Sequence, residues 1–198
     1  MQSDPLSGEG FAALRPVVTE LERLGIRYYI GGSVAGSAYG YARMTQDIDV
    51  VAELQMEHVQ PFVEALHKAY YVNANTVAEA VTRRSCFNLI HNNTYFKVDI
   101  FASKPSNYNR EAFQRRRKRP LIKEDPTTEF FIASAEDVIL SKLEWYRLGD
   151  EASDRQWTDI LKILEVQQHQ VDRTYLEKWA AELGVLDLLI KAWHELEK

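Results

Sequence analysis

The sequence contains very little cysteine and no long hydrophobic run. Cys86 is the only cysteine among 198 residues, which excludes an internal disulfide and a zinc site built from cysteines. A lone cysteine on a strand is usually a small buried hydrophobe, and we expect this of Cys86. Nowhere do about 18 uncharged apolar residues follow one another, so no membrane-spanning helix and no membrane partner are expected.

Signs of export, internal repeats and low-complexity segments are also lacking. Residues 1–10 contain no basic segment followed by an apolar one, and we therefore expect a cytoplasmic protein. The composition, 45% hydrophobic and 27% charged, is that of one soluble domain of ordinary size, or of a compact core with an appended helical part.

The net charge of −5 argues against a protein that coats nucleic acid. A local basic run that ends at Pro120 is the exception; its members are Arg110, Arg115, Arg116, Arg117, Lys118 and Arg119. Such a run binds the phosphates of RNA or of a nucleotide, or it is simply a solvated loop or helix face. The second interpretation is the commoner one.

A glycine-rich turn follows the first expected strand. Tyr28–Ile30 is predicted to be a strand and Val34–Tyr41 a helix of small residues, so Gly31, Gly32 and Ser33 lie at a strand-to-helix junction. Such a junction directs unpaired backbone N–H groups at an anion, and glycines let the chain turn sharply and let a ligand come close. The pattern predicts a phosphate-binding turn.

Two carboxylates alternate with apolar residues shortly afterwards. In the expected strand Asp47–Val51, Asp47 and Asp49 share one face while Ile48 and Val50 occupy the other. The two aspartates begin about 7 Å apart, at ~3.3 Å per residue, and can reach one cation. Because Mg²⁺ takes carboxylate oxygens together with substrate phosphates, the pair indicates metal-assisted phosphoryl chemistry.

A third acidic residue lies on a later strand. In Tyr95–Phe101 the residue Asp99 faces the same side as Lys97 and Phe101. If this strand is adjacent to the first, Asp99 completes a site for two metal ions. Two ions about 3.5–4 Å apart would activate an attacking hydroxyl and stabilise a departing pyrophosphate oxygen.

The remaining periodicity predicts an α+β fold. We expect a core at residues 1–132, with a mixed sheet flanked by helices, and a C-terminal helical bundle at residues 133–198 packed on it. The expected elements of the core are helices at Phe11–Leu24 and Met56–Tyr70, strands at Ser85–Ile90 and Tyr95–Phe101, and an edge strand at Glu129–Ile132. The basic run is expected to be a loop.

Lys142 interrupts the apolar stripe of the first C-terminal helix, which begins with a cap at Ser134. A buried lysine is unfavourable unless an anion satisfies it. The alternatives are a lysine that reaches solvent along its own stem and a cation that stabilises a triphosphate during a reaction. We favour the second.

These residues together resemble a known family. Gly31-Gly32-Ser33 followed by Asp47-Ile48-Asp49, with Arg43 and Thr45 just ahead and Asp99 on a later strand, resembles the nucleotidyltransferase superfamily built on the DNA polymerase beta fold. The downstream residues Lys142, Arg147 and Asp159 are similar to the lysine, arginine and aspartate of the helical motifs in minimal nucleotidyltransferases of toxin–antitoxin and abortive-infection systems. The resemblance covers residues 26–163.

The resemblance implies transfer of a nucleoside monophosphate from a nucleoside triphosphate, ATP among them, to a hydroxyl acceptor, with release of pyrophosphate. Asp47 and Asp49 would hold two Mg²⁺ ions, with Mn²⁺ as a second candidate metal. Asp99 would bind the catalytic metal and help to deprotonate the acceptor. Template-binding regions are missing, so a templated polymerase is excluded on size.

Further residues receive roles from the same resemblance. Gly32 and Ser33, with Gly31 beside them, would bind the β- and γ-phosphates, and Lys142 would neutralise phosphate charge. Arg43 would either contact phosphate or orient Asp49. Thr45 would belong to the nucleotide-binding residues, and Arg147 and Asp159 would support the site.

The acceptor and the assembly state remain open at this point. A small cationic molecule, a protein and the end of a tRNA are all candidate acceptors. A different hypothesis is a toxin–antitoxin component that binds a partner or nucleic acid with little or no catalysis. The least favoured interpretation treats the acidic residues as a solvated strand end and the glycines as a structural turn.

Overall fold

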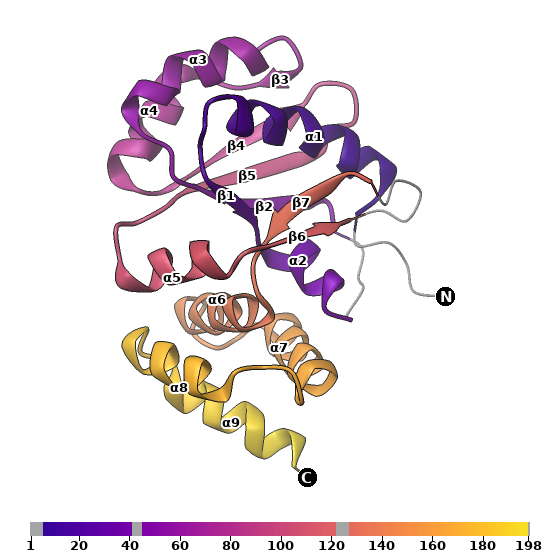
Figure 1. Cartoon of the computed structure of the whole chain (residues 1–198), viewed down its shortest axis with the longest axis vertical. Helices are drawn as coiled ribbons and strands as arrows, with labels where there is room; N and C mark the ends of the chain where they lie inside the picture. The colour runs from indigo at the N-terminus through magenta and orange to yellow at the C-terminus, as the bar shows by residue number, and fades with distance from the viewer. Residues whose placement is uncertain (1–5, 41–44, 122–126, 198) are drawn as a thin grey trace.

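The computed structural model describes residues 6–40, 45–121 and 127–197. Within that part of the chain, a seven-stranded mixed sheet forms the centre of the molecule, in the order β3-β4-β5-β2-β1-β7-β6 (Figure 1). Its strands are β1 (Tyr28–Ile30), β2 (Asp47–Ala52), β3 (Tyr70–Tyr71), β4 (Cys86–His91), β5 (Lys97–Ala102), β6 (Arg117–Pro120) and β7 (Glu129–Ile132). The pairs β1–β7 and β2–β5 are parallel, and the other neighbours are antiparallel.

Helices lie on both sides of this sheet. Those that precede β7 are α1 (Gly8–Arg23), α2 (Gly32–Ala38), α3 (Met56–Leu66), α4 (Ala74–Arg83) and α5 (Asn107–Arg115). Those that follow it are α6 (Ala135–Leu148), α7 (Asp154–Gln167), α8 (Arg173–Glu182) and α9 (Leu186–Leu196). The last four gather at one end of the molecule, with α1, α3 and α4 at the other (Figure 1). None of the described helices combines the length and apolarity needed to cross a bilayer.

Strict alternation along β2 gives the sheet one buried face and one open face. Ile48 and Val50 are fully buried, whereas Asp47 and Asp49 on the other face are only half-buried. On β5, Val98 and Ile100 are likewise fully buried. Helix α1 contacts both strands and covers the apolar face, so the core holds the backbone of the strands that carry the carboxylates.

The predicted α+β class is confirmed, and several element boundaries are corrected. Helix α2 spans Gly32–Ala38 and so begins two residues before the expected Val34; Gly32 itself has a positive φ of 53°. The second helix ends at Leu66 rather than Tyr70, since Tyr70–Tyr71 pairs with β4 as a short strand. Strand β3 and helix α4 were not foreseen.

The expected loop around the basic run is wrong, and so is the edge position of β7. The run forms the end of α5 and the strand β6, which pairs with β7 and becomes the edge of the sheet. Arg115 lies over the ring of Tyr175, and Arg116 lies over Phe131. Residues of β6 are exposed, in keeping with an edge strand that is blunted by charge and proline.

The C-terminal helices are joined to the sheet through the first turn of α6. Ser134 Oγ accepts a hydrogen bond from Asp137 N at 3.2 Å and donates to Asp137 Oδ2 at 2.6 Å, as the predicted cap requires. Tyr175 on α8 donates to Asp137 Oδ1 at 2.8 Å. Arg115 on α5 pairs with Glu136 at 2.9 Å, so one buried polar network connects α5, α6 and α8.

We predict that Ser134→Ala destabilises the fold by about 1–2 kcal/mol, because it removes a cap and leaves buried Asp137 with one partner fewer. The free energy of unfolding in urea measures this. Ser103→Ala is the control, since its exposed hydroxyl makes only a 3.4 Å contact with Lys104 O, and its effect is expected to stay within about 0.5 kcal/mol. Equal losses in the two variants would contradict the role given to this cap.

Candidate active site

The candidate site lies on the open face of β4, β5 and β2, where strand register arranges side chains in three cross-strand rows. Parallel pairing places Asp49 opposite Asp99, and antiparallel pairing places Asn88 opposite Asp99 on the other side. The rows are Ile90–Lys97–Asp47, Asn88–Asp99–Asp49 and Cys86–Phe101–Val51. Neighbouring strands are about 4.8 Å apart, so the carboxylates of Asp49 and Asp99 are close neighbours.

Each of two predicted carboxylates already has a close partner. Lys97 Nζ pairs with Asp99 Oδ2 at 2.7 Å, and the Asn88 side-chain amide donates a short hydrogen bond to Asp99 Oδ1. Thr45 Oγ1 donates to Asp47 Oδ1 at 2.6 Å. The predicted residue Thr45 therefore positions Asp47, while Lys97 places a positive charge among the carboxylates.

The glycine turn closes over Asp49. Gly31 N donates to Asp49 O at 2.9 Å, which fixes the turn to β2. A Cβ atom at Gly32 would lie 1.7 Å from Asp49 Oδ2, so only glycine fits this position. Gly31, Gly32 and Ser33 thus lie beside the carboxylates, as the sequence predicts. Because α2 has only seven residues, turn N–H groups rather than a helix dipole are the relevant donors here.

The surroundings of Asp49 disfavour the charged form of its carboxyl group. Burial, with further contributions from the negative charges of Asp47 and Asp99, raises the pKa of Asp49 to about 6. The positive charges of Lys142 and Lys97 act in the opposite direction without cancelling the effect. An excess of negative charge therefore remains at the centre of the site.

The chemistry of this site fits a divalent metal, although its side chains are not gathered into a complete ligand set. Hard oxygen donors beside uncompensated negative charge are what Mg²⁺ requires. Over residues 6–40, 45–121 and 127–197, no three His, Cys, Asp or Glu side chains are close enough together to hold an ion. Metal binding through Asp99 would require Lys97 to release one of its carboxylate oxygens.

Lys142 lies at the boundary between the sheet and the helices. It is buried and pairs with Asp159 on α7 through a 2.7 Å contact to Oδ2. Its stem passes Gly36 on α2, where an added Cβ would lie 3.8 Å from Lys142 Cε. The predicted residues Lys142 and Asp159 therefore meet each other, and the charge of Lys142 acts on Asp49.

Other predicted residues lie elsewhere. Arg147 contacts Asp187 on α9 at 2.6 Å and Glu151 at 3.4 Å, so the structure places its guanidinium in a surface ion pair and not among the carboxylates. Arg43 lies outside the described residues. The expectation that Cys86 is buried is wrong: Phe87 takes the inward position of β4, and Cys86 is exposed on the open face.

Sequence reasoning also missed two contributors. No sequence pattern marked Asn88 as part of the site, because its position opposite Asp99 depends on the register between β4 and β5. The sequence placed Lys97 on the same face as Asp99, but the ion pair that this position allows was not predicted.

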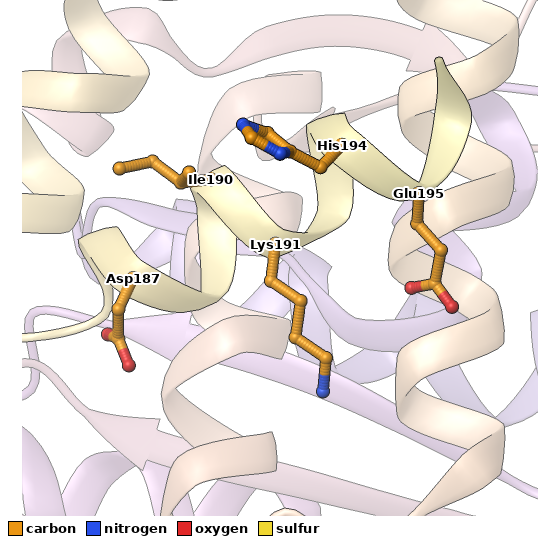
Figure 2. Close-up of a pocket in the computed structure, with 5 residues that line it drawn as sticks. All are labelled: Asp187, Ile190, Lys191, His194 and Glu195. Atoms are coloured by element: carbon orange, nitrogen blue, oxygen red, sulfur yellow. The ribbon is translucent and has the colours of Figure 1, made fainter. Parts of the chain in front are cut away.

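A separate pocket of about 410 Å³ lies on α9 and is not part of this site (Figure 2). It is lined by Asp187, Ile190, Lys191, His194 and Glu195. Its charged groups already have partners, because Asp187 binds Arg147, Glu195 accepts from Trp157 Nε1 at 2.7 Å, and Lys191 lies over the Trp157 ring. Three of the four ionisable residues that line the pocket are therefore engaged by neighbouring side chains.

Comparison with known proteins identifies the fold. No protein-family model matches the chain, and no curated protein matches it in sequence. Among solved structures, the antibiotic-resistance factor ANT(2'')-Ia aligns over 93% of this chain and 96% of its own, with 15% identity and a TM-score of 0.56. An antigenic nucleotidyltransferase-like protein from Paracoccidioides brasiliensis aligns over 94% of both chains, with 17% identity and a TM-score of 0.52.

The chain has a nucleotidyltransferase fold. At this level of identity the likeness extends to the fold alone. In this nucleotidyltransferase fold, the carboxylate face described above is formed by the central strands of the sheet and bordered by α2 and α6.

The geometry of the glycine turn predicts unequal effects of two glycine substitutions. Gly25→Ala introduces only backbone strain, since φ is +69° and nothing lies within 4 Å, and should destabilise by about 1–2 kcal/mol. Gly32→Ala adds a collision with Asp49, and we expect a loss of about 2–4 kcal/mol. Urea unfolding measures both, and equal losses would show that Asp49 does not lie against the turn.

Because the pKa of Asp49 is raised, we predict that Asp49→Asn increases the free energy of unfolding, by an amount that depends on pH, when a metal chelator is present. The folded pKa of about 6 exceeds the ordinary value of 3.8, so the wild type loses stability as pH rises through this range. Near pH 8 the variant should be more stable by about 1–3 kcal/mol, and the difference should vanish near pH 4.

A matched carboxylate serves as the control for this experiment. Asp187 is exposed, and its hydrogen bond to Arg147 lowers its pKa. Asp187→Asn should therefore not increase the free energy of unfolding at high pH. A stability difference for Asp49→Asn that does not change with pH would contradict the assignment.

Proposed function

We propose that the protein transfers a nucleoside monophosphate from a nucleoside triphosphate to a hydroxyl acceptor and releases pyrophosphate. The observation that supports this most directly is the in-register placement of Asp49 opposite Asp99, with Asp47 on the same face and the glycine turn against Asp49. In the reaction the acceptor oxygen forms a bond to the α-phosphorus, and the bond to the bridging oxygen of pyrophosphate breaks.

The three carboxylates have different roles in this proposal. Asp47 and Asp49 would hold the divalent ions, Mg²⁺ or Mn²⁺, with Asp99 as an additional ligand. Bound metal would supply charge for the attacking and departing oxygens. Asp99 takes the proton of the acceptor hydroxyl, and Thr45 keeps the carboxylate of Asp47 turned toward the site.

The cationic and backbone groups bind the triphosphate. Gly31, Gly32 and Ser33 present the turn to the β- and γ-phosphates on the β1 side of the carboxylates. Lys142, held by Asp159, neutralises phosphate charge from the α6 side. Lys97 offsets part of the repulsion among the carboxylates of the nucleotide-free site, and it would exchange Asp99 for a phosphate when substrate and metal bind.

Incubation with labelled nucleoside triphosphates, Mg²⁺ and an extract of the source cells tests this function. We expect label from the α-phosphate in an acceptor and a loss of at least about 100-fold in Asp47→Asn, since even residues that only support metal ligands matter 10–100-fold. Asp187→Asn, the same change on the surface of α9, should retain full transfer.

Two results would contradict the proposal. The first is the absence of transfer with all four nucleotides, and the second is equal transfer by the wild type and Asp47→Asn. Stable capture of a partner without transfer would support the alternative, a toxin–antitoxin component that acts by binding. Cytoplasmic location, the assembly state and the division at residue 132 stay predictions.

A further inference from the structure

An aromatic pair borders the candidate site on the side away from the glycine turn. Phe101 follows Asp99 by two residues and therefore lies on the same face of β5, about 7 Å farther along the strand. Trp145 on α6 follows Lys142 by three residues, so both project from neighbouring positions of the helix. The two rings meet edge to face, with centroids 6.0 Å apart and an interplanar angle of 65°.

The exposure of Trp145 is unusual within this protein. Its side chain is 51% exposed, whereas Trp179 is 2% exposed and packs in the core. Trp157 donates its indole N–H to Glu195, and Trp193 is covered by Arg173. The Trp145 indole makes no hydrogen bond with any other described residue, so both a ring face and an N–H donor remain available beside the carboxylates.

The row that contains Phe101 is apolar on both sides. Val51 lies opposite Phe101 on β2, and Cys86 lies opposite it on β4. The hydroxyl groups of a sugar placed on this row would lose water without a polar partner from Val51 or Phe101, whereas a flat apolar ring would gain contact.

Topology separates this row from the triphosphate side of the site. The glycine turn follows β1, on one side of β2, whereas β5 and β4 lie on the other side. A triphosphate at the turn therefore leaves the Phe101 row free, next to Asp99. Asp99 is the group that receives the acceptor proton in the proposed function.

We propose that Trp145 and Phe101 form a subsite for an aromatic ring of the acceptor, with the reacting hydroxyl carried about one ring's breadth from that ring. This inference rests on the proposed function and adds the class of substrate: a hydroxyl compound with a planar aromatic group. A saturated, polycationic sugar would lack the group that the subsite binds. Trp145 is then a specificity-determining residue that contacts substrate.

Fluorine NMR with a matched pair of probes tests the subsite without relying on catalysis. Para-fluorophenethyl alcohol carries an aromatic ring and a hydroxyl, and its para-fluorocyclohexyl analogue carries a saturated ring of similar size. We expect the aromatic probe to bind the wild-type protein and Trp145→Phe, and to bind Trp145→Leu at least about fivefold more weakly. The saturated probe should bind the wild-type protein at least about fivefold more weakly than the aromatic probe does.

Trp193→Leu is the matched control, because it makes the same change on α9, away from the carboxylates, and should leave probe binding unchanged. Circular dichroism of each variant verifies the fold. Equal binding of the aromatic probe to the wild type and a folded Trp145→Leu would overturn the subsite, and so would equal binding of both probes to the wild type.

The labelled-nucleotide experiment separates failure of the subsite from failure of the proposed function. Transfer that depends on Asp47 but not on Trp145 would remove the aromatic subsite and leave the nucleotidyl transfer intact. With a transferring acceptor in hand, Trp145→Leu should raise KM at least about fivefold more than it lowers kcat, because the ring binds remote from the reacting atoms. A fall in kcat alone would contradict the subsite.

Discussion

The parallel pairing of β2 with β5 is the constraint on which the rest of the site depends. Register sets Asp49 opposite Asp99, and the apolar residues between them on each strand are held by the core beneath. A slip of one residue would turn the carboxylates inward and the apolar side chains outward, at a large loss of buried surface. Hydrophobic burial on one face therefore specifies the positions of charged groups on the other.

Charge in this molecule is balanced by lysines that come from different parts of the chain. Lys97 shares a strand face with Asp99, so its ion pair is local, whereas Lys142 depends on the packing of α6 against α2 and α7. Neither lysine forms its ion pair with Asp49, and burial, with the neighbouring charges of Asp47 and Asp99, raises the pKa of Asp49 to about 6. Metal binding requires the carboxylates to lie close together, whereas the stability of the fold favours their separation, because clustered carboxylates repel one another until a cation binds.

Much of the arrangement could be predicted from local sequence, and the remainder depended on distant contacts. Alternation in β2 predicted the shared face of Asp47 and Asp49, and the glycine turn was placed correctly because a strand and a helix are connected there. The strand β6 was missed, because a run of charged residues gives no strand pattern, and its pairing depends on distant contacts such as that of the Lys118 ammonium group with the ring of Phe131. The contact between Trp145 and Phe101 joins residues 44 positions apart and has no local signal.

The central claim is that the carboxylates on the β2–β5 face share a divalent cation, and diffraction from a crystal soaked with Mn²⁺ and a non-hydrolysable nucleoside triphosphate tests it most directly. The account predicts an anomalous peak about 2.0–2.2 Å from oxygen atoms of Asp49 and Asp99, with Lys97 withdrawn from Asp99. A bound nucleotide with no Mn²⁺ at these oxygens, or Lys97 still paired with Asp99 beside an unligated ion, would contradict it.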